Sequence, residues 1–327
     1  MLAALAAFSG FSPAHAQQLV TLTDQVRNPY GLVTGPDGAL YICEIDNHRV
    51  SRYDFVTRKL SVVVDQSVEK NIQEPYEVRF DRKGDLYFVD MKGHRVYRFE
   101  RQTRKLSVIA GTGEPGFSGD GGPAASAQLK QPHSIAFDPQ GRLLICDIGN
   151  HRVRRMDLKT GLIETYIGNG ERKAVADGAP ASTATALNGP RAIDFDRNGN
   201  MYLALREGNA IYRVSPKEQK LVHLAGTGEK GNTGDGGDAR KARLNGPKGV
   251  SCAPDGSLYL ADTENHTIRR INPKGIISTV AGSGARGNGT ETRPLECAMD
   301  RPHGVFADRR GVVYIGDSEA HKVRVLR

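Results

Sequence analysis

The chain contains six copies of one unit, and this repetition limits its fold more than any other feature of the sequence. Each copy opens with a proline, and successive opening prolines lie 46, 57, 58, 57 and 55 residues apart. After the proline come four short runs in which apolar and polar residues alternate, separated by turns rich in glycine and aspartate. In the second copy the later runs are Leu86–Val89, Arg95–Phe99 and Lys105–Ile109. Four such runs predict a four-stranded antiparallel sheet.

Six sheets of this kind favour an all-β fold, a six-bladed β-propeller that spans residues 17–327 as one domain. The sixth copy ends in its third strand, at Lys322–Arg327. The segment Leu19–Thr23 precedes the first copy and has the same alternation, so we expect it to supply the outer strand of the sixth blade and close the ring. An open solenoid is the alternative, and it would leave unpaired strand edges at both ends.

Residues 1–16 form an apolar stretch that ends in Ala14-His15-Ala16. Such a run followed by an A-x-A pattern is typical of a secretory signal peptide, so we expect cleavage before Gln17 and a periplasmic or secreted protein. A frayed tail on a cytoplasmic protein is the weaker alternative. The basic residues that usually precede the apolar run are missing, which favours a natural start upstream of Met1. No later segment approaches the roughly 18 consecutive apolar residues of a membrane span, so none is expected.

Composition excludes several classes of protein. The chain has four cysteines and no CxxC or CxxCH pattern, which excludes a disulfide scaffold and gives no sign of a zinc knuckle or attached haem. Cys43 and Cys146 take equivalent places in their units and are expected to be buried thiols, whereas pairing of Cys252 with Cys297 stays open. The net charge of +8 permits an acidic partner. Much of the excess lies on the third strands, where we expect a belt around the ring, and export makes nucleic acid an unexpected partner.

Three segments carry a motif of known repeat proteins. They read DIGNHRV at 147–153, EIDNHRV at 44–50 and DTENHTI at 262–268. With openings such as Pro247-Lys248-Gly249-Val250 they resemble the NHL repeat, and the resemblance covers essentially the whole chain after residue 16. It implies a six-bladed NHL-type propeller. Such propellers include lyases, protein-binding and RNA-binding modules and sensor domains, so the resemblance leaves the function open.

Five histidines share one place in the repeat, just after the second strand. Recurrence at the same local site predicts a scaffold role in packing and hydrogen bonding. Metal ligation is less favoured, because the five would ring the mouth of the propeller without converging. The acids that precede them are expected to cap turns. The histidines are His48, His94, His151, His266 and His321, and the acids are Glu44, Asp90, Asp147, Asp262 and Asp317.

The longest connections join the fourth strand of one unit to the first strand of the next. Two are near copies, Gly111–Gly122 and Gly226–Gly237, and Gly168–Gly178 matches them in length. Because strand direction alternates, we expect all long loops on one face, with tight glycine turns on the other. Connections of this length are often functional. Their aspartates favour turns over calcium binding, since the spaced oxygen ligands of a calcium loop are missing; they are Asp120, Asp177 and Asp235.

The residue after each opening proline is the most informative. The first strand of each blade is innermost and starts at the long-loop face, so six side chains should converge on the axis of the ring. A repeat that is monotonous elsewhere is variable, polar and basic here, which favours a binding site. A channel filled by whichever side chains solvate well is the alternative. The six residues are Tyr30, Tyr76, His133, Arg191, Lys248 and His303.

Two openings are similar to those of the peptide-amidating lyases, which are NHL-like propellers. In that family histidines of Pro-His-Gly and Pro-His-Ser openings hold zinc, and His133 and His303 stand in such openings. The resemblance implies a metal at these two histidines, although a catalytic zinc ordinarily has three protein ligands. It also implies substrate contact by Arg206, where the acid of the family's motif is missing. In the calcium-dependent lactonase propellers the ligands are carboxylates and asparagines, for which Glu77 or Glu74 is the candidate here.

These observations predict an exported propeller whose axial mouth binds a small anionic molecule, a glycan or a peptide end, with Arg191 and Lys248 as anion contacts. The alternative is a metal-assisted lyase or lactone hydrolase at the same mouth, with zinc or calcium polarising a carbonyl or activating water. In that alternative Tyr30 or Tyr76 transfers protons, and Arg191 or Arg206 holds a carboxylate. A protein partner is compatible with the binding function.

Overall fold

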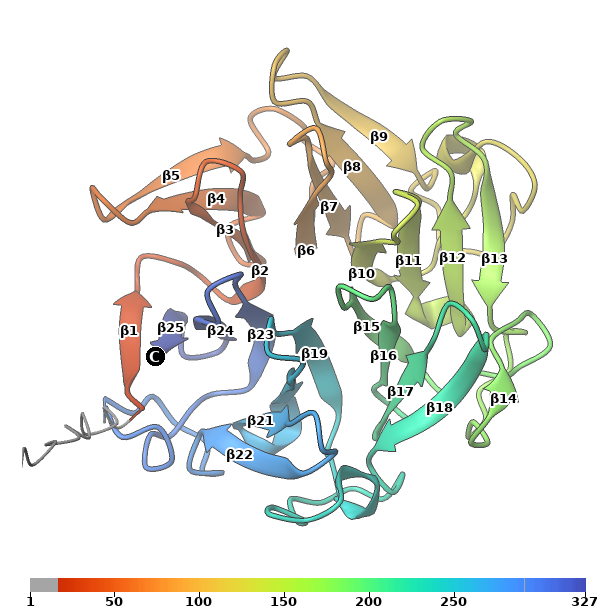
Figure 1. Ribbon diagram of the computed structural model, residues 1–327. Helices are drawn as coiled ribbons and strands as arrows, with labels where there is room; N and C mark the ends of the chain where they lie inside the picture. The colour runs from red at the N-terminus through yellow and green to blue at the C-terminus, as the bar shows by residue number, and fades with distance from the viewer. Residues whose placement is uncertain (1–16, 291) are drawn as a thin grey trace, which may run out of the picture.

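Six antiparallel sheets surround a common axis in the computed structural model, which describes residues 17–290 and 292–327 (Figure 1). The predicted six-bladed β-propeller is confirmed, and its blades follow one another in chain order. The first strands of neighbouring blades contact each other around the axis, so residues of these strands line it. The predicted signal peptide at 1–16 lies outside the described residues.

Each blade runs outward from its first strand to its fourth. Blade one contains β2 (Pro29–Thr34), β3 (Leu40–Glu44), β4 (Arg49–Asp54) and β5 (Lys59–Val64). Blade two contains β6 (Pro75–Phe80), β7 (Leu86–Asp90), β8 (Arg95–Phe99) and β9 (Leu106–Ala110). Blade three contains β10 (Pro132–Phe137), β11 (Leu143–Asp147), β12 (Arg152–Met156) and β13 (Ile163–Ile167).

The second half of the ring repeats this order. Blade four contains β15 (Pro190–Phe195), β16 (Met201–Leu205), β17 (Ala210–Val214) and β18 (Lys220–Ala225), with the short β14 (Ala179–Pro180) added outside β18. Blade five contains β19 (Pro247–Cys252), β20 (Leu258–Asp262), β21 (Thr267–Ile271) and β22 (Ile277–Ala281). Blade six contains β23 (Pro302–Ala307), β24 (Val313–Asp317), β25 (Lys322–Leu326) and β1 (Leu19–Thr23).

The outer strand of blade six comes from the opposite end of the chain. β1 pairs antiparallel with β25, with Leu19 opposite Leu326 and Val20 opposite Val325 (Figure 1). The predicted ring closure is thus confirmed, and the open solenoid is excluded. Leu19 is 2% exposed, so the closing strand also contributes to the core of the blade.

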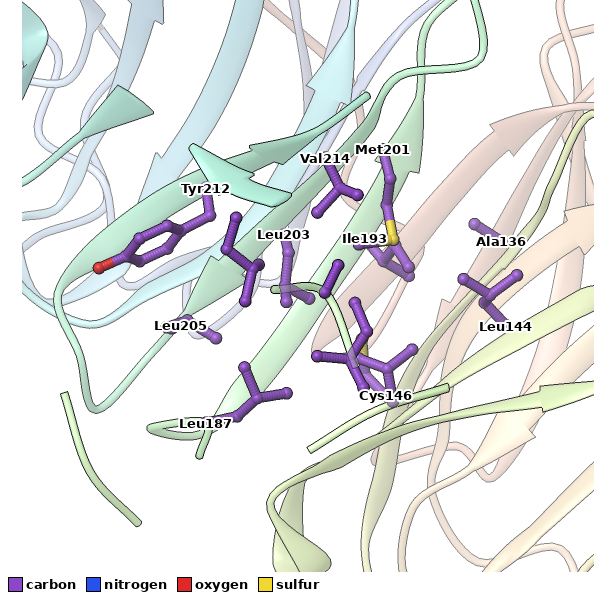
Figure 2. Close-up of a cluster of buried hydrophobic side chains, with 14 of the residues drawn as sticks. Ala136, Leu144, Cys146, Leu187, Ile193, Met201, Leu203, Leu205, Tyr212 and Val214 are labelled. Atoms are coloured by element: carbon purple, nitrogen blue, oxygen red, sulfur yellow. The ribbon is translucent and has the colours of Figure 1, made fainter. Parts of the chain in front are cut away.

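Apolar side chains fill the spaces between neighbouring blades. The five residues of β11 are all buried, because the second strand of a blade is covered on both faces by the adjacent sheets. Figure 2 shows the space between blades three and four, where Leu144 and Cys146 approach Ile193 and Leu203. This packing of sheet on sheet, repeated around the ring, fixes the distance between the first strands at the axis.

The cysteines belong to these interblade cores. Cys43 and Cys146 are buried, as predicted. Cys252 packs against the core between blades four and five, and Cys297 lies in the core between blades five and six.

Helical structure in residues 17–290 and 292–327 consists of four short 3₁₀ segments: η1 (Ala124–Ser126), η2 (Ile148–Asn150), η3 (Ala239–Lys241) and η4 (Thr263–Asn265). Within the described residues, no helix has the length and apolar character needed to cross a membrane.

Buried carboxylates tie the incoming loops to the blades. Asp262 accepts the backbone N–H of Asn245 at 2.7 Å, and Asp147 accepts that of Lys130 at the same distance. Both carboxylates are fully buried. These acids were expected to cap the turns that follow them, and this is wrong for Asp147 and Asp262, whose side chains do not cap the 3₁₀ turns they precede. Each instead fastens the segment that leads into the first strand of its own blade.

Arginines of three third strands point into the protein. Arg154, Arg269 and Arg324 are at most 1% exposed. The expected outer belt of basic residues is therefore wrong at these positions. The physical reason is that these arginines form ion pairs with carboxylates. Arg154 lies 2.7 Å from Asp120, and Arg269 lies 2.6 Å from Asp235. These loop aspartates thus anchor their loops to the blades.

Repeat histidines form hydrogen bonds between neighbouring blades. All five adopt a left-handed backbone conformation, with φ between 50° and 56°. Nδ1 of His94 accepts the N–H of Gln131 at 3.0 Å, and Nδ1 of His321 accepts that of Asn28 at 3.0 Å. In blade four Asn209 takes this place, and its side chain accepts an N–H from the loop entering blade five at 2.9 Å. The predicted scaffold role is confirmed for His94 and His321, whereas Nδ1 of His151 has no hydrogen-bond partner among the described residues.

The long loops run along the outer edges of the blades they enter. The N–H of Gly121 donates to the carbonyl of Ile163 at 2.8 Å, and the N–H of Ile163 donates back to the loop at 3.0 Å. Gly236 and Ile277 repeat this pairing at blade five, and β14 pairs with β18 at blade four. The loops were expected to gather on one face, but much of their length covers strand edges that would otherwise be open to pairing.

Candidate functional site

The six side chains that follow the opening prolines meet at the axis of the ring. They line a common cavity with neighbouring residues of the first strands. Its volume is about 20 Å³, which is room for about one water molecule. The axial mouth is therefore largely filled by its own side chains. Its lining includes Tyr30, Tyr76, Glu77, His133, Arg191, Lys248 and His303.

Aromatic rings form one half of the mouth. Tyr30 stacks on His303 with ring centres 4.1 Å apart and contacts Tyr76 edge to face at 4.4 Å. Tyr76 in turn contacts His133 edge to face at 4.6 Å. Contacts of this kind add to the stabilisation from buried area. They hold the rings of blades six, one, two and three in a continuous row.

Arg191 lies in the other half and is 3% exposed. Its Nη2 donates to the hydroxyl of Tyr76 at 2.7 Å, while its Nε is buried without a hydrogen-bond partner among the described residues. No carboxylate of the described chain forms an ion pair with it. The other buried arginines, Arg154, Arg269 and Arg324, each pair with a carboxylate. A buried cation without a counter-ion is costly, so Arg191 marks a place where an anion would be stabilised.

Lys248 joins the mouth to a cluster of ion pairs beside it. Its Nζ lies 2.7 Å from Oε1 of Glu264 and 3.1 Å from Nε2 of His303. Arg301 contacts the same oxygen of Glu264 at 2.8 Å and reaches Glu319 at 2.5 Å. Lys248 and Arg301 thus share Glu264, and Glu319 gives Arg301 a second carboxylate, so these two cations are matched by two carboxylates.

Burial and charge set the protonation of this cluster. Burial, together with the positive charges of Lys248 and Arg191, holds the pKa of His303 well below its usual value. Burial and Arg191 also lower the pKa of Lys248 to about 7, against the opposing effect of Glu264. Burial disfavours ionisation of Glu264, but hydrogen bonds from Arg301 and Lys248 outweigh it and lower the pKa of Glu264 to about 2. His303 is therefore neutral, and Lys248 titrates near neutral pH.

A second charged group lies deeper along the axis. Glu77 pairs with Arg79 there, and both side chains are largely buried. Burial raises the pKa of Glu77 despite Arg79, and it also raises the pKa of the nearby Asp194. Glu74 pairs with Lys92 at 2.5 Å. Both candidates for a calcium ligand are thus engaged in ion pairs.

The two histidines considered for metal binding have different surroundings. Nδ1 of His133 lies 2.6 Å from the carbonyl of Gln131, and Nδ1 of His303 lies 2.7 Å from the carbonyl of Arg301. Nε2 of His303 accepts from Lys248, so both ring nitrogens of His303 are engaged. In the described part of the chain, no three His, Cys, Asp or Glu side chains form a metal-binding group. These contacts do not favour a shared metal, which stays a prediction.

Arg206 lies away from the other predicted site residues. It does not line the axial cavity, its side chain is 42% exposed, and its Nη1 pairs with Glu207 at 2.8 Å. Among the tyrosines considered for proton transfer, Tyr30 is unsuited to it at neutral pH. Burial and the neighbouring Tyr76 raise the pKa of Tyr30 far above its usual value.

Glu264 and Arg301 belong to the site, although the repeat pattern had not singled them out. Glu264 precedes the asparagine of the repeat motif, where blade three has Gly149 and blade one has Asp46. This place varies from blade to blade, as the residues after the prolines do, so the same criterion would have found it. Arg301 stands directly before Pro302, and its charge was the available signal.

The chain is similar to known repeat proteins. The model of the Teneurin NHL domain matches residues 19–187 and 218–301. Protein SUPPRESSOR OF QUENCHING 1 of Arabidopsis thaliana is 26% identical over 229 residues, which cover 67% of this chain and 21% of that protein. Human NHL repeat-containing protein 2 is 26% identical over 247 residues, which cover 67% of this chain and 34% of that protein. Mouse teneurin-1 is 29% identical over 189 residues, which cover 54% of this chain and 6% of that protein. The chain therefore spans about a third or less of the length of these relatives.

Solved structures share the architecture with little sequence identity. An auxiliary nutrient binding protein from Bacteroides thetaiotaomicron has a TM-score of 0.72 at 18% identity, covering 98% of this chain and 78% of that chain. Virginiamycin B lyase from Staphylococcus aureus has a TM-score of 0.57 at 17% identity, covering 95% and 98%. At these identities the likeness shows the fold alone.

Proposed function

The chain belongs to the family of Teneurin NHL domains, and we propose that its axial mouth binds the anionic end of a small molecule, glycan or peptide. Because propellers of this kind have many functions, the proposal is argued from the residues of the mouth itself. Arg191 carries this proposal. It is buried, and the described part of the chain supplies it with no carboxylate. A carboxylate of a ligand would provide the missing counter-ion.

The mouth offers an anion several complementary contacts. Arg191 presents donors in a fixed fork that matches the two oxygens of a carboxylate. Lys248 supplies a second positive charge near the axis. Tyr30, Tyr76 and His133 are half-buried, whereas Arg191 and Lys248 are buried, so a ligand would enter past the aromatic half.

The size of the cavity limits what enters it. A volume of about 20 Å³ admits about one water molecule, so a carboxylate requires at least one lining side chain to rotate. The rest of the ligand would then lie outside, over the mouth. This favours recognition of a charged end over enclosure of a whole molecule.

A metal-assisted lyase or lactone hydrolase at the same mouth is the alternative. It needs a metal at His133 and His303 and, in a zinc site, a third protein ligand. Metal analysis of the purified protein distinguishes the two functions. Stoichiometric zinc or calcium that is lost in His303→Ala and retained in His151→Ala would establish the alternative. Protein that binds carboxylates without such a metal would support the binding function.

The binding proposal is tested by calorimetry with paired probes. Glycylglycine and glucuronate carry a carboxylate, and glycylglycine amide and glucose are counterparts that lack it. We expect the two carboxylates to bind and their counterparts not to bind. In Arg191→Met the affinity should fall by about tenfold or more, since hydrogen bonds to charged groups contribute about 1.5–3 kcal/mol.

Arg206→Met is the matched control, because Arg206 lies outside the cavity and pairs with Glu207. It should bind the carboxylates as the unmodified protein does. Equal affinity for acid and amide, equal affinity in Arg191→Met, or no carboxylate binding at all would overturn the proposal.

A further inference from the structure

A second hollow lies on the face of the tight turns, opposite the axial mouth. It crosses blades six, one and two, which follow one another around the ring, and extends from β1 to the turn at residues 81–84. Its volume is about 1770 Å³, well above the roughly 300–1,000 Å³ of small-molecule pockets. This hollow, the turn-face groove, therefore has room for a segment of a larger molecule.

The turn-face groove carries most of the excess charge of the chain. Eight Lys and Arg residues and two Asp residues line it. Arg79 pairs with Glu77 outside the groove, which leaves a surplus of five, compared with a net charge of +8 for the whole chain. A concentration of one sign of charge in a concave surface attracts partners of the opposite sign. The basic residues are Arg58, Arg79, Arg82, Lys83, Arg101, Arg309, Arg310 and Arg327, and the acids are Asp81 and Asp308.

The aspartates of the groove are used by the turns themselves. Asp81 accepts the backbone N–H of Lys83 at 2.9 Å, and Asp308 accepts that of Arg310 at 2.8 Å. Asp308 also pairs with the side chain of Arg310 at 3.1 Å. Lys83 and Arg309 are exposed and form no ion pair with any residue that the structure describes. Their charges are therefore free to pair with the carboxylates of a partner.

The floor of the groove is apolar. Phe55, Phe306 and Val312 line it and are half-buried. Tyr53 and Tyr314 lie beneath and are 4% and 2% exposed, so only the half-buried phenylalanine rings reach the surface of the floor. Apolar side chains of a polypeptide fit this floor better than nucleotides or sugars, and a small anion would leave it uncovered.

We propose that the turn-face groove binds an extended, acidic segment of a partner polypeptide. Successive side chains of an extended chain point in opposite directions, so one set can place carboxylates at the basic rim while the other covers the apolar floor. No residue lining the groove also lines the axial cavity. The ion pair of Arg79 with Glu77 joins the walls of the two sites, but the residues that carry the two proposals differ, so failure of one proposal leaves the other standing.

The test measures binding of a fluorescein-labelled peptide of alternating Glu and Val by fluorescence anisotropy. We expect saturable binding that weakens as salt is raised. The variant Lys83→Glu with Arg309→Glu should lose about tenfold or more in affinity, because it replaces two attractive rim charges by repulsive ones. Both side chains are exposed, so the fold should be retained.

Arg197→Glu with Lys274→Glu is the matched control. Both residues lie in exposed tight turns on the same face, outside the groove, and the change in net charge is the same. It should bind the peptide as the unmodified protein does. The proposal is overturned if the two double variants bind equally or if a peptide with Gln in place of each Glu binds as well as the Glu–Val peptide. It is also overturned if heparin or single-stranded DNA binds and the peptide does not.

Discussion

Arg191 of blade four donates a hydrogen bond of 2.7 Å to the hydroxyl of Tyr76 of blade two, across the end of the axis. The guanidinium carbon lies 4.5 Å from the centre of the Tyr76 ring. Blade three lies between them and contributes His133, whose ring contacts the ring of Tyr76 edge to face. This bond joins two blades that are not neighbours. It holds the guanidinium at the centre of the mouth while leaving Nε without a partner among the described residues.

Tyr76→Phe should destabilise the protein by about 1.5–3 kcal/mol, because it removes the hydroxyl that accepts from a buried, charged guanidinium. Urea unfolding followed by circular dichroism measures the loss. Tyr41→Phe is the control, since its hydroxyl bonds Asp37 at 3.2 Å near the surface and should contribute less. An equal loss of unfolding free energy in both variants would mean that the Arg191–Tyr76 bond contributes no more to stability than a surface hydrogen bond.

Carboxylate binding at the mouth should weaken as pH rises through about 7. Burial and Arg191 lower the pKa of Lys248 to about 7, so Lys248 is an ammonium below that pH and neutral above it. A bound anion favours the charged form, so affinity should be about tenfold lower at pH 8 than at pH 6.

Lys248→Arg should flatten this profile, because arginine stays charged over the whole range. Titration calorimetry at several pH values gives both curves. An affinity of the unmodified protein that does not change with pH would show that Lys248 takes no part.

Asp317→Ala should cost about 3–5 kcal/mol of unfolding free energy, because it leaves the buried Arg324 without its carboxylate partner at 2.7 Å. The double variant Asp317→Ala with Arg324→Met should recover part of this loss, since it also removes the uncompensated charge. Asp24→Ala, at an exposed position, should change stability by less than about 0.5 kcal/mol. A double variant no more stable than Asp317→Ala would contradict the ion-pair account.

Removal of residues 17–23 should open the ring, because β1 then no longer covers β25. We expect a lower Tm and self-association through the exposed strand edge, measured by calorimetry and size-exclusion chromatography. A synthetic peptide of residues 17–23 should raise the Tm in a concentration-dependent way, as any ligand of the native state does. The same peptide with Leu19→Asp should not. A truncated protein with unchanged Tm would contradict closure by this strand.

Much of the architecture was predictable because each blade carries its own local pattern. Alternating runs such as Leu86–Val89 predict strands wherever they occur, and six repeats leave few ways to arrange them. The place of Leu19–Thr23 followed from a missing fourth strand in the last unit. The convergence of the residues after the prolines followed from strand order alone.

Other features depend on contacts between distant segments, which no local pattern reports. Arg154 reads as an ordinary charged residue of a third strand, but its buried position depends on Asp120, 34 residues earlier in the chain. The narrowness of the mouth depends on how closely the blades pack. The turn-face groove gathers turns of three blades, and its signal was the basic sequence Asp-Arg-Lys-Gly at 81–84 and Asp-Arg-Arg-Gly at 308–311.

A crystal structure of the protein with saturating acetate at about pH 6 tests the central claim most directly. The account predicts an acetate in the axial mouth with its oxygens within hydrogen-bond distance of the Arg191 guanidinium, including the Nε that otherwise lacks a partner. A mouth that holds only water under these conditions, with Arg191 still bonded to Tyr76 alone, would contradict it.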